Sequence, residues 1–254
     1  MAQVNHFYRN LHHKSRNIEK YIYIRRKNKE LLLMKDILHF LRELRTHNNR
    51  EWFNAHKKEY TELRTRFETY VNQLIGLIGD KDDELHGLEA SSCLYRIYRD
   101  IRFSPDKTPY KTHFAAYMAK GGKSSPRAGY YLHIEPGNCL LCGGIWCPQS
   151  PLLKALRQSV YDNCDEFLEI LHEPSFREIY HGLDNERALK VMPRPFPKDF
   201  PYPELLKQRD YLAYASKDDA FFESGNWLHR TAEELLVLHP FNQFLNYTYD
   251  ELNG

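Results

Sequence analysis

The amino-acid sequence predicts an α+β domain with a central antiparallel sheet flanked by long N-terminal and C-terminal helices. Apolar residues recur at helical spacing between residues 34 and 78 and again near the end of the chain. Between them, residues 93–147 hold short runs of Tyr, Ile, Phe and Thr separated by turn signals. The chain of 254 residues is long enough for one such domain with a sizeable core, so we assign residues 34–250 to it.

The segment before this domain, residues 1–33, has no sustained periodicity and carries eight basic side chains against two acidic ones. It is either a basic tail for nucleic acid or a membrane surface, or a loosely ordered extension in front of a true start at Met34. Amphipathic order begins abruptly at Met34, which favours the second interpretation. We therefore expect a loosely ordered basic extension.

Two helices are predicted at the start of the domain. Ile37, Leu41 and Leu44 lie on the apolar stripe of the first helix. The polar residues 46–49 provide an N-cap for the second helix, and Glu51 then lies in its first turn. A stripe from residue 52 to residue 78 predicts one helix of about 29 residues.

Four strands are predicted in the middle of the chain. They are expected near residues 94–103, 113–119, 128–135 and 139–146. The last two are joined across Glu135-Pro136-Gly137-Asn138, a strong turn signal. The short connections predict an antiparallel meander.

Helices return after the meander. Ser150 and Pro151 have the pattern of an N-cap followed by proline at the first helical position, and helix continues to Tyr180 with a break at Pro174. Five prolines between residues 193 and 203 predict a loop. Around this loop we expect strands at 189–191 and 211–215, a short helix near 203–208, and a C-terminal helix from Ser224 or Asn226 with a kink or restart at Pro240.

The distribution of charge points to an anion site. Residues 91–130 carry eight basic side chains against two acidic ones, although the formal charge of the whole chain is only +2. A local basic region in an otherwise acidic body concentrates positive potential. The candidate ligand-binding residues are Arg96, Arg99, Arg102, Lys107, Lys111 and Arg127.

Arg99 is the most informative of these residues. On a strand over 94–103 it would share the core face with Ile97 and Ile101, while Arg96 and Arg102 would lie on the other face. A buried arginine needs a carboxylate partner or a ligand anion. A structural arginine–carboxylate network is the favoured interpretation, and an arginine cluster for phosphate or carboxylate is the functional one.

His113 and His133 are the candidate catalytic residues. His133 would share a strand face with Tyr131 and Glu135, which suits general acid–base chemistry. A histidine in a structural hydrogen bond is the alternative. The sequence contains no nucleophile elbow, no HExxH and no carboxylate pair that specifies a mechanism.

We expect no metal site and no cofactor. Cys139 and Cys142 would point to opposite faces of a strand, and no second Cys/His pair has the spacing of a zinc site. Residues 121–124 resemble the end of a Walker A loop but lack its first glycine, since residue 117 is Tyr. Five cysteines without a signal peptide predict a reducing, cytoplasmic setting, and the short apolar runs predict a soluble protein without membrane association.

Four long strings resemble a bacterial family catalogued as domain of unknown function 2461. They are Asn48–Phe53, Arg96–Phe103, Asp106–His113 and Ser125–Pro136. The resemblance extends over residues 34 to about 246 and implies that residues 1–33 are an addition to the family's domain. It implies no activity, cofactor or site residue.

Two function classes follow from the residues themselves. The first is a cytoplasmic enzyme or ligand-binding domain with an arginine- and lysine-rich pocket for an anionic small molecule. The alternative is an interaction module that binds nucleic acid or an acidic protein partner through its basic, aromatic surface. Convergent basic side chains would favour the first, and a flat basic stripe with exposed tyrosines the second.

Overall fold

The computed structural model describes residues 34–254, and the predictions for residues 1–33 lie outside the described residues. A four-stranded sheet occupies its centre, in which each strand is antiparallel to the next and the spatial order is the chain order. The strands are β1 (Phe114–Met118), β2 (Gly129–Ile134), β3 (Cys139–Ile145) and β4 (Tyr211–Lys217). The predicted α+β class and its central antiparallel sheet are confirmed.

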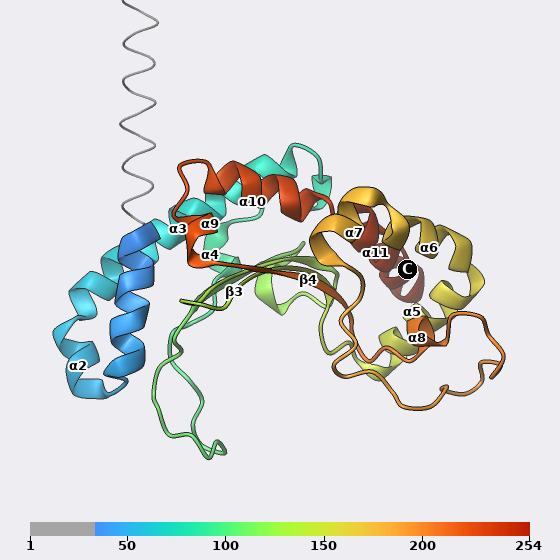
Figure 1. The fold of residues 1–254 in the computed structure, drawn as a ribbon, viewed down its shortest axis with the longest axis horizontal. Coiled ribbons are helices and arrows are strands. Elements are labelled where there is room, and N and C mark those ends of the chain that lie inside the picture. Colours follow the sequence, from blue (N-terminus) through green and yellow to red (C-terminus); the bar gives the residue numbers. More distant parts are fainter. Residues whose placement is uncertain (1–33) are drawn as a thin grey trace, which may run out of the picture.

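One face of the sheet carries the helical layer. The helices α3 (Lys57–Gly79) and α10 (Trp227–Leu236) lie over this face and pack against each other (Figure 1). Alternation along β2 directs Tyr130, Leu132 and Ile134 into this layer, where each is at most 1% exposed. The hydrophobic core therefore lies between the sheet and these two helices.

The N-terminal helices agree with the predicted pattern except at one residue. Residues 34–46 are helical, and the Asn49 side chain then caps α2 (Arg50–Ala55) by accepting a hydrogen bond from the Trp52 backbone N–H at 2.9 Å. The predicted long helix is divided at His56, between α2 and α3. His56 has φ −102° and ψ 12°, which are not helical values, and its ring stacks on Trp52 with Nδ1 2.8 Å from the Trp52 carbonyl oxygen.

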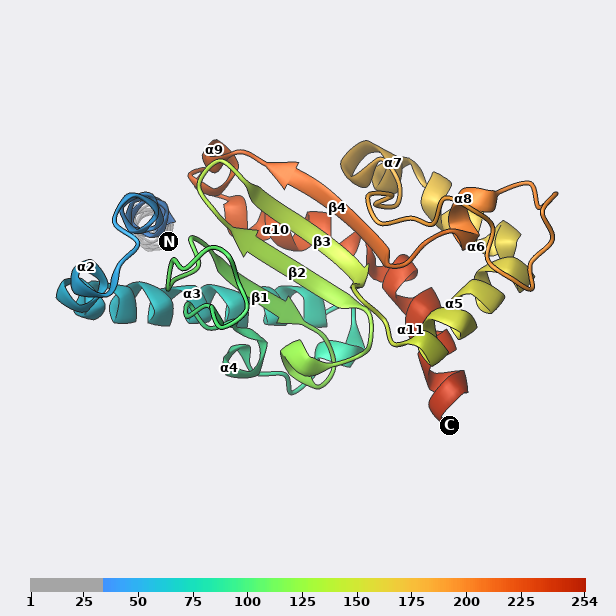
Figure 2. The same ribbon diagram turned by 90° about the horizontal axis from the view of Figure 1, so that it is seen from below.

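The C-terminal helices form a second group beside the sheet. In it α11 (His239–Asn253) packs against α5 (Ser150–Asp162) and α6 (Cys164–His172) (Figure 2). Prolines begin two helices where breaks were predicted: Pro174 starts α7, and Pro240 lies in the first turn of α11. The remaining short helices are α4 (Ala90–Cys93), α7 (Pro174–Tyr180), α8 (Pro203–Leu206) and α9 (Asp219–Phe222), with 3-10 turns η1 (Asp83–Leu85) and η2 (Gly122–Ser124).

Two predicted strands are wrong. Residues 94–103 form only isolated bridges, Leu94 with Ala116 and Tyr98 with Tyr110. Residues 96–112 form a projecting loop, here called the arm, on the side of the sheet opposite α3 and α10 (Figure 1). Its returning half contains Pro105 and Pro109, which lack the N–H groups that a continuous ladder requires.

The second is residues 189–191, which lie in the proline-rich loop. Leu189 donates one backbone hydrogen bond, to Lys207, and no ladder follows. Prolines from residue 193 onward remove the donors with which a strand would continue.

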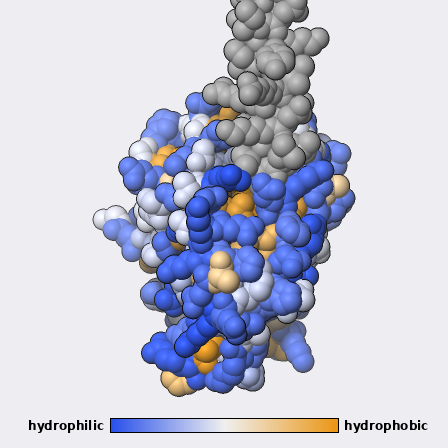
Figure 3. All heavy atoms as spheres, turned by 90° about the vertical axis from the view of Figure 1, so that its left-hand side faces the viewer, coloured by the Kyte–Doolittle hydropathy of each residue, from blue (hydrophilic) through white to orange (hydrophobic). Residues whose placement is uncertain are grey.

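One side of the molecule is mostly polar (Figure 3). The side of the molecule on which residues 34–46 and α2 lie shows hydrophilic residues with scattered apolar ones (Figure 3). Among the described residues, no helix has the length and apolar character required to cross a membrane.

Candidate functional site

The second face of the sheet has no helix lying across it in the described part of the chain; we call it the open face (Figure 2). Alternation along β2 places Tyr131 and His133 there, opposite to their core neighbours. Glu135 follows directly after β2. Strand register and pleat therefore bring titratable side chains onto the face that the helices leave uncovered.

His133 is hydrogen-bonded through both ring nitrogens. The Tyr131 hydroxyl lies 2.9 Å from its Nδ1, and its Nε2 lies 3.3 Å from Glu135 Oε2. The residue is 7% exposed, and burial lowers the pKa of His133 although Glu135 opposes this shift. In the neutral ring, Nε2–H donates to Glu135 while Nδ1 accepts from Tyr131.

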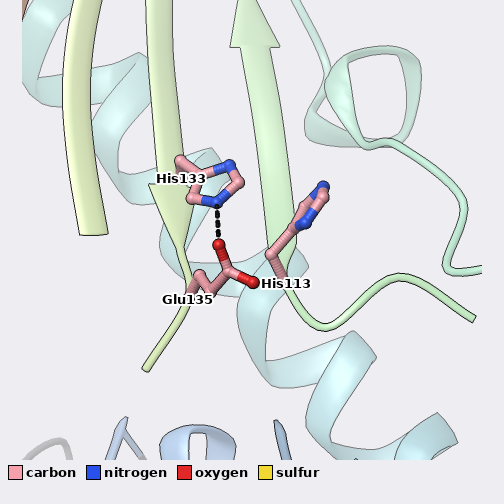
Figure 4. A group of neighbouring side chains, drawn as sticks. All are labelled: His113, His133 and Glu135. Atoms are coloured by element: carbon pink, nitrogen blue, oxygen red, sulfur yellow. Dashed lines mark hydrogen bonds and ion pairs between the residues drawn. The ribbon is translucent and has the colours of Figure 1, made fainter. Parts of the chain in front are cut away.

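His113 joins this group from the neighbouring strand. It immediately precedes β1, and its ring centroid lies 4.2 Å from that of His133. Burial, followed by the neighbouring His133, lowers the pKa of His113 to about 4. Among the described residues nothing hydrogen-bonds to its ring nitrogens, and Figure 4 shows the ring beside His133 and Glu135.

Glu135 is fixed by its neighbours. Thr112 Oγ1 donates to its Oε1 at 2.6 Å, and Asn138 Nδ2 donates to its Oε2 at 2.9 Å. Arg45 NH2 lies 3.9 Å from Oε1. Burial acts to raise the pKa of Glu135, but the hydrogen bonds from Thr112, Asn138 and His133 outweigh it and hold the pKa below its usual value. The carboxylate is therefore ionised and held in one orientation.

Three of the six predicted anion-binding residues are paired with carboxylates. Arg99 is bonded to Asp106 and to Thr108 within the arm. Arg102 is bonded to Asp100, with NH2 2.7 Å from Oδ2. These pairs favour the structural interpretation of both arginines. Arg99 is not in the core because the strand that would have placed it there does not form.

Arg127 is the third paired residue and lies far from the histidines in the fold. It is 8% exposed and is held between Glu84 of η1 and Asp250 of α11. Its guanidinium also lies 5.2 Å from the centre of the Tyr249 ring. Because Glu84 and Asp250 already neutralise the guanidinium, Arg127 is not available to bind an external anion.

Arg96 and Lys111 remain without a carboxylate partner within ion-pair distance in the described part of the chain. Lys111 Nζ lies 5.3 Å from the centre of the Tyr95 ring, and burial together with Arg96 lowers the pKa of Lys111. The charge of Lys111 contributes to the lowered pKa of both His113 and His133, after burial in each case. Lys107, the sixth residue, donates instead to the Ile101 carbonyl at 2.9 Å.

The cysteines do not gather at this site. Cys142 pairs in register with Tyr131 and so lies on the open face, whereas Cys139 belongs to the core. This agrees with the predicted opposite orientation of the two thiols. Cys147 lies beyond β3 and contacts Arg187, with NH1 2.7 Å from Sγ.

A cleft lies elsewhere in the molecule and is not lined by His113 or His133. This cleft of about 810 Å³ opens between η1, α5 and α11 and is lined by acidic side chains. At its edge Asp82 Oδ2 accepts a hydrogen bond from the Tyr130 hydroxyl at 2.6 Å and lies 3.3 Å from His239 Nδ1. Its acidic lining would repel an anionic ligand, so we place the candidate site on the open face.

The comparison with protein families gives one match: the model described as conserved hypothetical protein (DUF2461) matches residues 36–244. The comparisons with curated proteins and with solved structures give no match. The description of the family names no activity, so the geometry of the open face carries the functional argument.

Proposed function

The chain belongs to the DUF2461 family of conserved hypothetical proteins, and we propose that it binds a small anionic molecule on the open face of its sheet. In this proposal Lys111 and Arg96 hold the anionic group. His113 and His133 then act on the neighbouring atoms of the bound molecule, in the simplest case by proton transfer.

One observation carries the proposal: Lys111, which has no carboxylate partner among the described residues, acts on both imidazoles of the His113–His133 pair, and Arg96 acts in turn on Lys111. The partly buried position of Lys111 supports it further, because removing an unpaired ammonium from water is costly unless an anion balances it. The neighbouring Arg96 adds repulsion that a bound anion would relieve. The six predicted ligand residues are thereby reduced to two.

The neighbouring residues orient one histidine and leave the other without hydrogen-bond partners among the described residues. His133 is oriented by Tyr131 and Glu135, and the His113 nitrogens are left for an external partner. The five cysteines are free thiols, which supports the expected reducing, cytoplasmic setting.

The proposal is tested with inorganic phosphate and succinate as probes, by calorimetry on the full chain. Lys111→Met and Arg96→Met should each weaken probe binding at least tenfold, because each removes a cation from the site. Arg102→Met is the matched control, since Arg102 is paired with Asp100 and its side chain is 76% exposed. Equal weakening in all three variants, or no binding of either probe to the wild type, would contradict the proposal.

The interaction-module alternative keeps one specific observation in its favour. Phe103 is 94% exposed on the arm, and the charged Arg102 guanidinium lies 5.9 Å from its ring centre. An exposed aromatic ring beside a cation suits stacking on single-stranded nucleic acid. Salt-dependent binding of a labelled oligonucleotide that is lost in Phe103→Ala but kept in Lys111→Met would favour this function over the anion site.

A further inference from the structure

We propose that His113, His133 and Glu135 bind one divalent first-row transition-metal ion on the open face. The inference rests on the proposed function only for the location of the site, and it changes the role of the two histidines. The histidines would bind the ion instead of transferring protons. The ion would in turn bind an anionic oxygen ligand.

The distances already approach those of a metal site. One ligand atom from each of the three side chains can be chosen so that all lie within 4.8 Å of one another. Bonds of about 2.1 Å in tetrahedral geometry place ligand atoms about 3.4 Å apart. His133 Nε2 and Glu135 Oε2 are 3.3 Å apart, so one edge of that tetrahedron is present. His113 must approach by roughly an ångström, which rotation of a side chain without hydrogen-bonded nitrogens provides.

The scaffold holds the three groups from rigid positions. His133 lies on the central strand β2, and Phe114 of β1 pairs with Ile134, so the register brings His113 level with Glu135. Figure 4 shows all three side chains on the same side of the sheet, with His133 and Glu135 joined. His133 is on a strand, and His113 and Glu135 each adjoin a strand end, which keeps ligand geometry better than positions within long loops.

The hydrogen bonds around the three groups are those that metal ligands usually have. With an ion bound, the ring takes its other tautomer: Nδ1–H donates to the Tyr131 hydroxyl at 2.9 Å, and the unprotonated Nε2 faces Glu135 and the ion. Thr112 and Asn138 hold the carboxylate from behind. Such partners orient imidazole and carboxylate ligands and fix the ring nitrogen that binds the ion.

The donor set selects the ion and its ligand. Two imidazoles and one carboxylate suit Zn²⁺, Fe²⁺ and Co²⁺, whereas Mg²⁺ and Ca²⁺ prefer oxygen ligands alone. Three protein ligands leave positions open, as in catalytic sites. The positive charge of Lys111 lowers the pKa of both histidines and would likewise repel a metal ion bound alone. An anionic oxygen ligand bound to both the ion and the Lys111 ammonium group would offset that repulsion. The expected substrate class is a small molecule with a carboxylate or phosphate group.

The test is calorimetric titration of the full chain, freed of metal by a chelator, with Zn²⁺ and separately with Co²⁺ and anaerobic Fe²⁺. We expect one ion per chain. His113→Ala and His133→Ala should each weaken binding at least 100-fold, and Glu135→Gln, which keeps the hydrogen-bonding shape, at least tenfold. The absorption spectrum of bound Co²⁺ should change in Glu135→Gln, which reports a lost ligand where a purely structural role would leave the spectrum unaltered.

Two controls separate this site from other donors. His229→Ala removes an exposed histidine of α10, on the helical side of the sheet. A combined variant removes other side chains able to bind metal: His6, His12, His13 and Cys147. Both controls should bind the ion within twofold of the wild type. Absence of binding, binding lost in the combined variant, or wild-type affinity in both His113→Ala and Glu135→Gln would overturn the proposal.

The metal and anion proposals can fail separately. If the Lys111→Met variant still binds the metal ion but no longer binds phosphate, both proposals are supported. Phosphate binding to the metal-free chain that depends on Lys111, with no ion bound, leaves the proposed function and removes the metal site. Circular dichroism and thermal melts of each variant show whether a lost signal reflects unfolding, and Glu135→Gln serves where a histidine variant does not fold.

Discussion

The ring centroids of His113 and His133 lie 4.2 Å apart, and of these two residues only His133 has ring nitrogens that are hydrogen-bonded to other described residues. Two imidazoles this close cannot both carry a proton without repulsion. Their proximity therefore disfavours a charge on both rings, and neutral His113 keeps a nitrogen lone pair that no described residue uses.

The first prediction concerns acid stability of the metal-free chain. His113 has a folded pKa of about 4 against 6.5 when unfolded, with His133, Glu135 and Lys111 facing it. Between these values the unfolded chain takes up a proton that the folded chain refuses, so stability present above pH 6.5 falls as pH decreases toward 4. Denaturant melts at pH 7 and pH 5 should show a loss on the order of 1–2 kcal/mol attributable to His113. Between pH 7 and pH 5, the free energy of unfolding of His113→Gln should fall by that much less than that of the wild type. An equal fall in both proteins would contradict the assignment to His113.

The second prediction concerns Arg99, whose partner Asp106 has a side chain that is 56% exposed. Exposed pairs contribute little, so Arg99→Met should lower the free energy of unfolding by about 1 kcal/mol or less. Phosphate should stabilise this variant as much as it does the wild type, because Arg99 is outside the proposed anion site. A loss of several kcal/mol by urea unfolding would show that Arg99 supports more than the arm.

Arg127 should behave differently, because its guanidinium is buried between Glu84 and Asp250. Arg127→Met leaves these carboxylates facing each other, and we expect a loss of about 2–4 kcal/mol in urea unfolding. The second change Glu84→Gln removes one stranded charge and should recover part of that loss. Identical stability of the single and double variants would argue against charge as the cause.

The fourth prediction uses two glycines that both have positive φ. Gly144 in β3 has φ +105°, and a Cβ there would lie 2.0 Å from the Tyr211 carbonyl oxygen of β4. Gly137 has φ +75° with no atom within 4 Å of such a Cβ. Gly144→Ala should therefore cost about 3 kcal/mol or more, against about 1 kcal/mol for Gly137→Ala. Thermal melts of the two variants give the comparison, and equal costs would mean that the contact with β4 relaxes.

The sequence was sufficient for elements whose signals are local. The Asn49 cap, the turn after Glu135 and the proline start at Pro174 each depend on a few adjacent residues, and each occurs in the structure. At α5 the prediction is wrong by one residue: the N-cap is Gln149, Ser150 is the first helical residue and Pro151 the second. The strand expected at 94–103 depended on alternation alone. Alternation cannot show whether a neighbouring segment is able to pair, and the prolines on the returning half of the arm prevent it.

The site was predictable only in part, for a related reason. Both histidines were identified, and Glu135 follows from the period of two along β2. The approach of His113 to Glu135 depends on the register between β1 and β2, which spacing does not specify when a loop of ten residues (119–128) joins them. The separation of paired from unpaired basic residues likewise needs the positions of Asp106, Glu84 and Asp250.

The position of Arg127 also bears on how the protein assembles during synthesis. When the ribosome has produced the sheet hairpin but not yet α11, Arg127 has only Glu84 as a partner, because Asp250 follows it by 123 positions. The second carboxylate and the Tyr249 ring both belong to α11, so this junction can be completed only after that helix has been made.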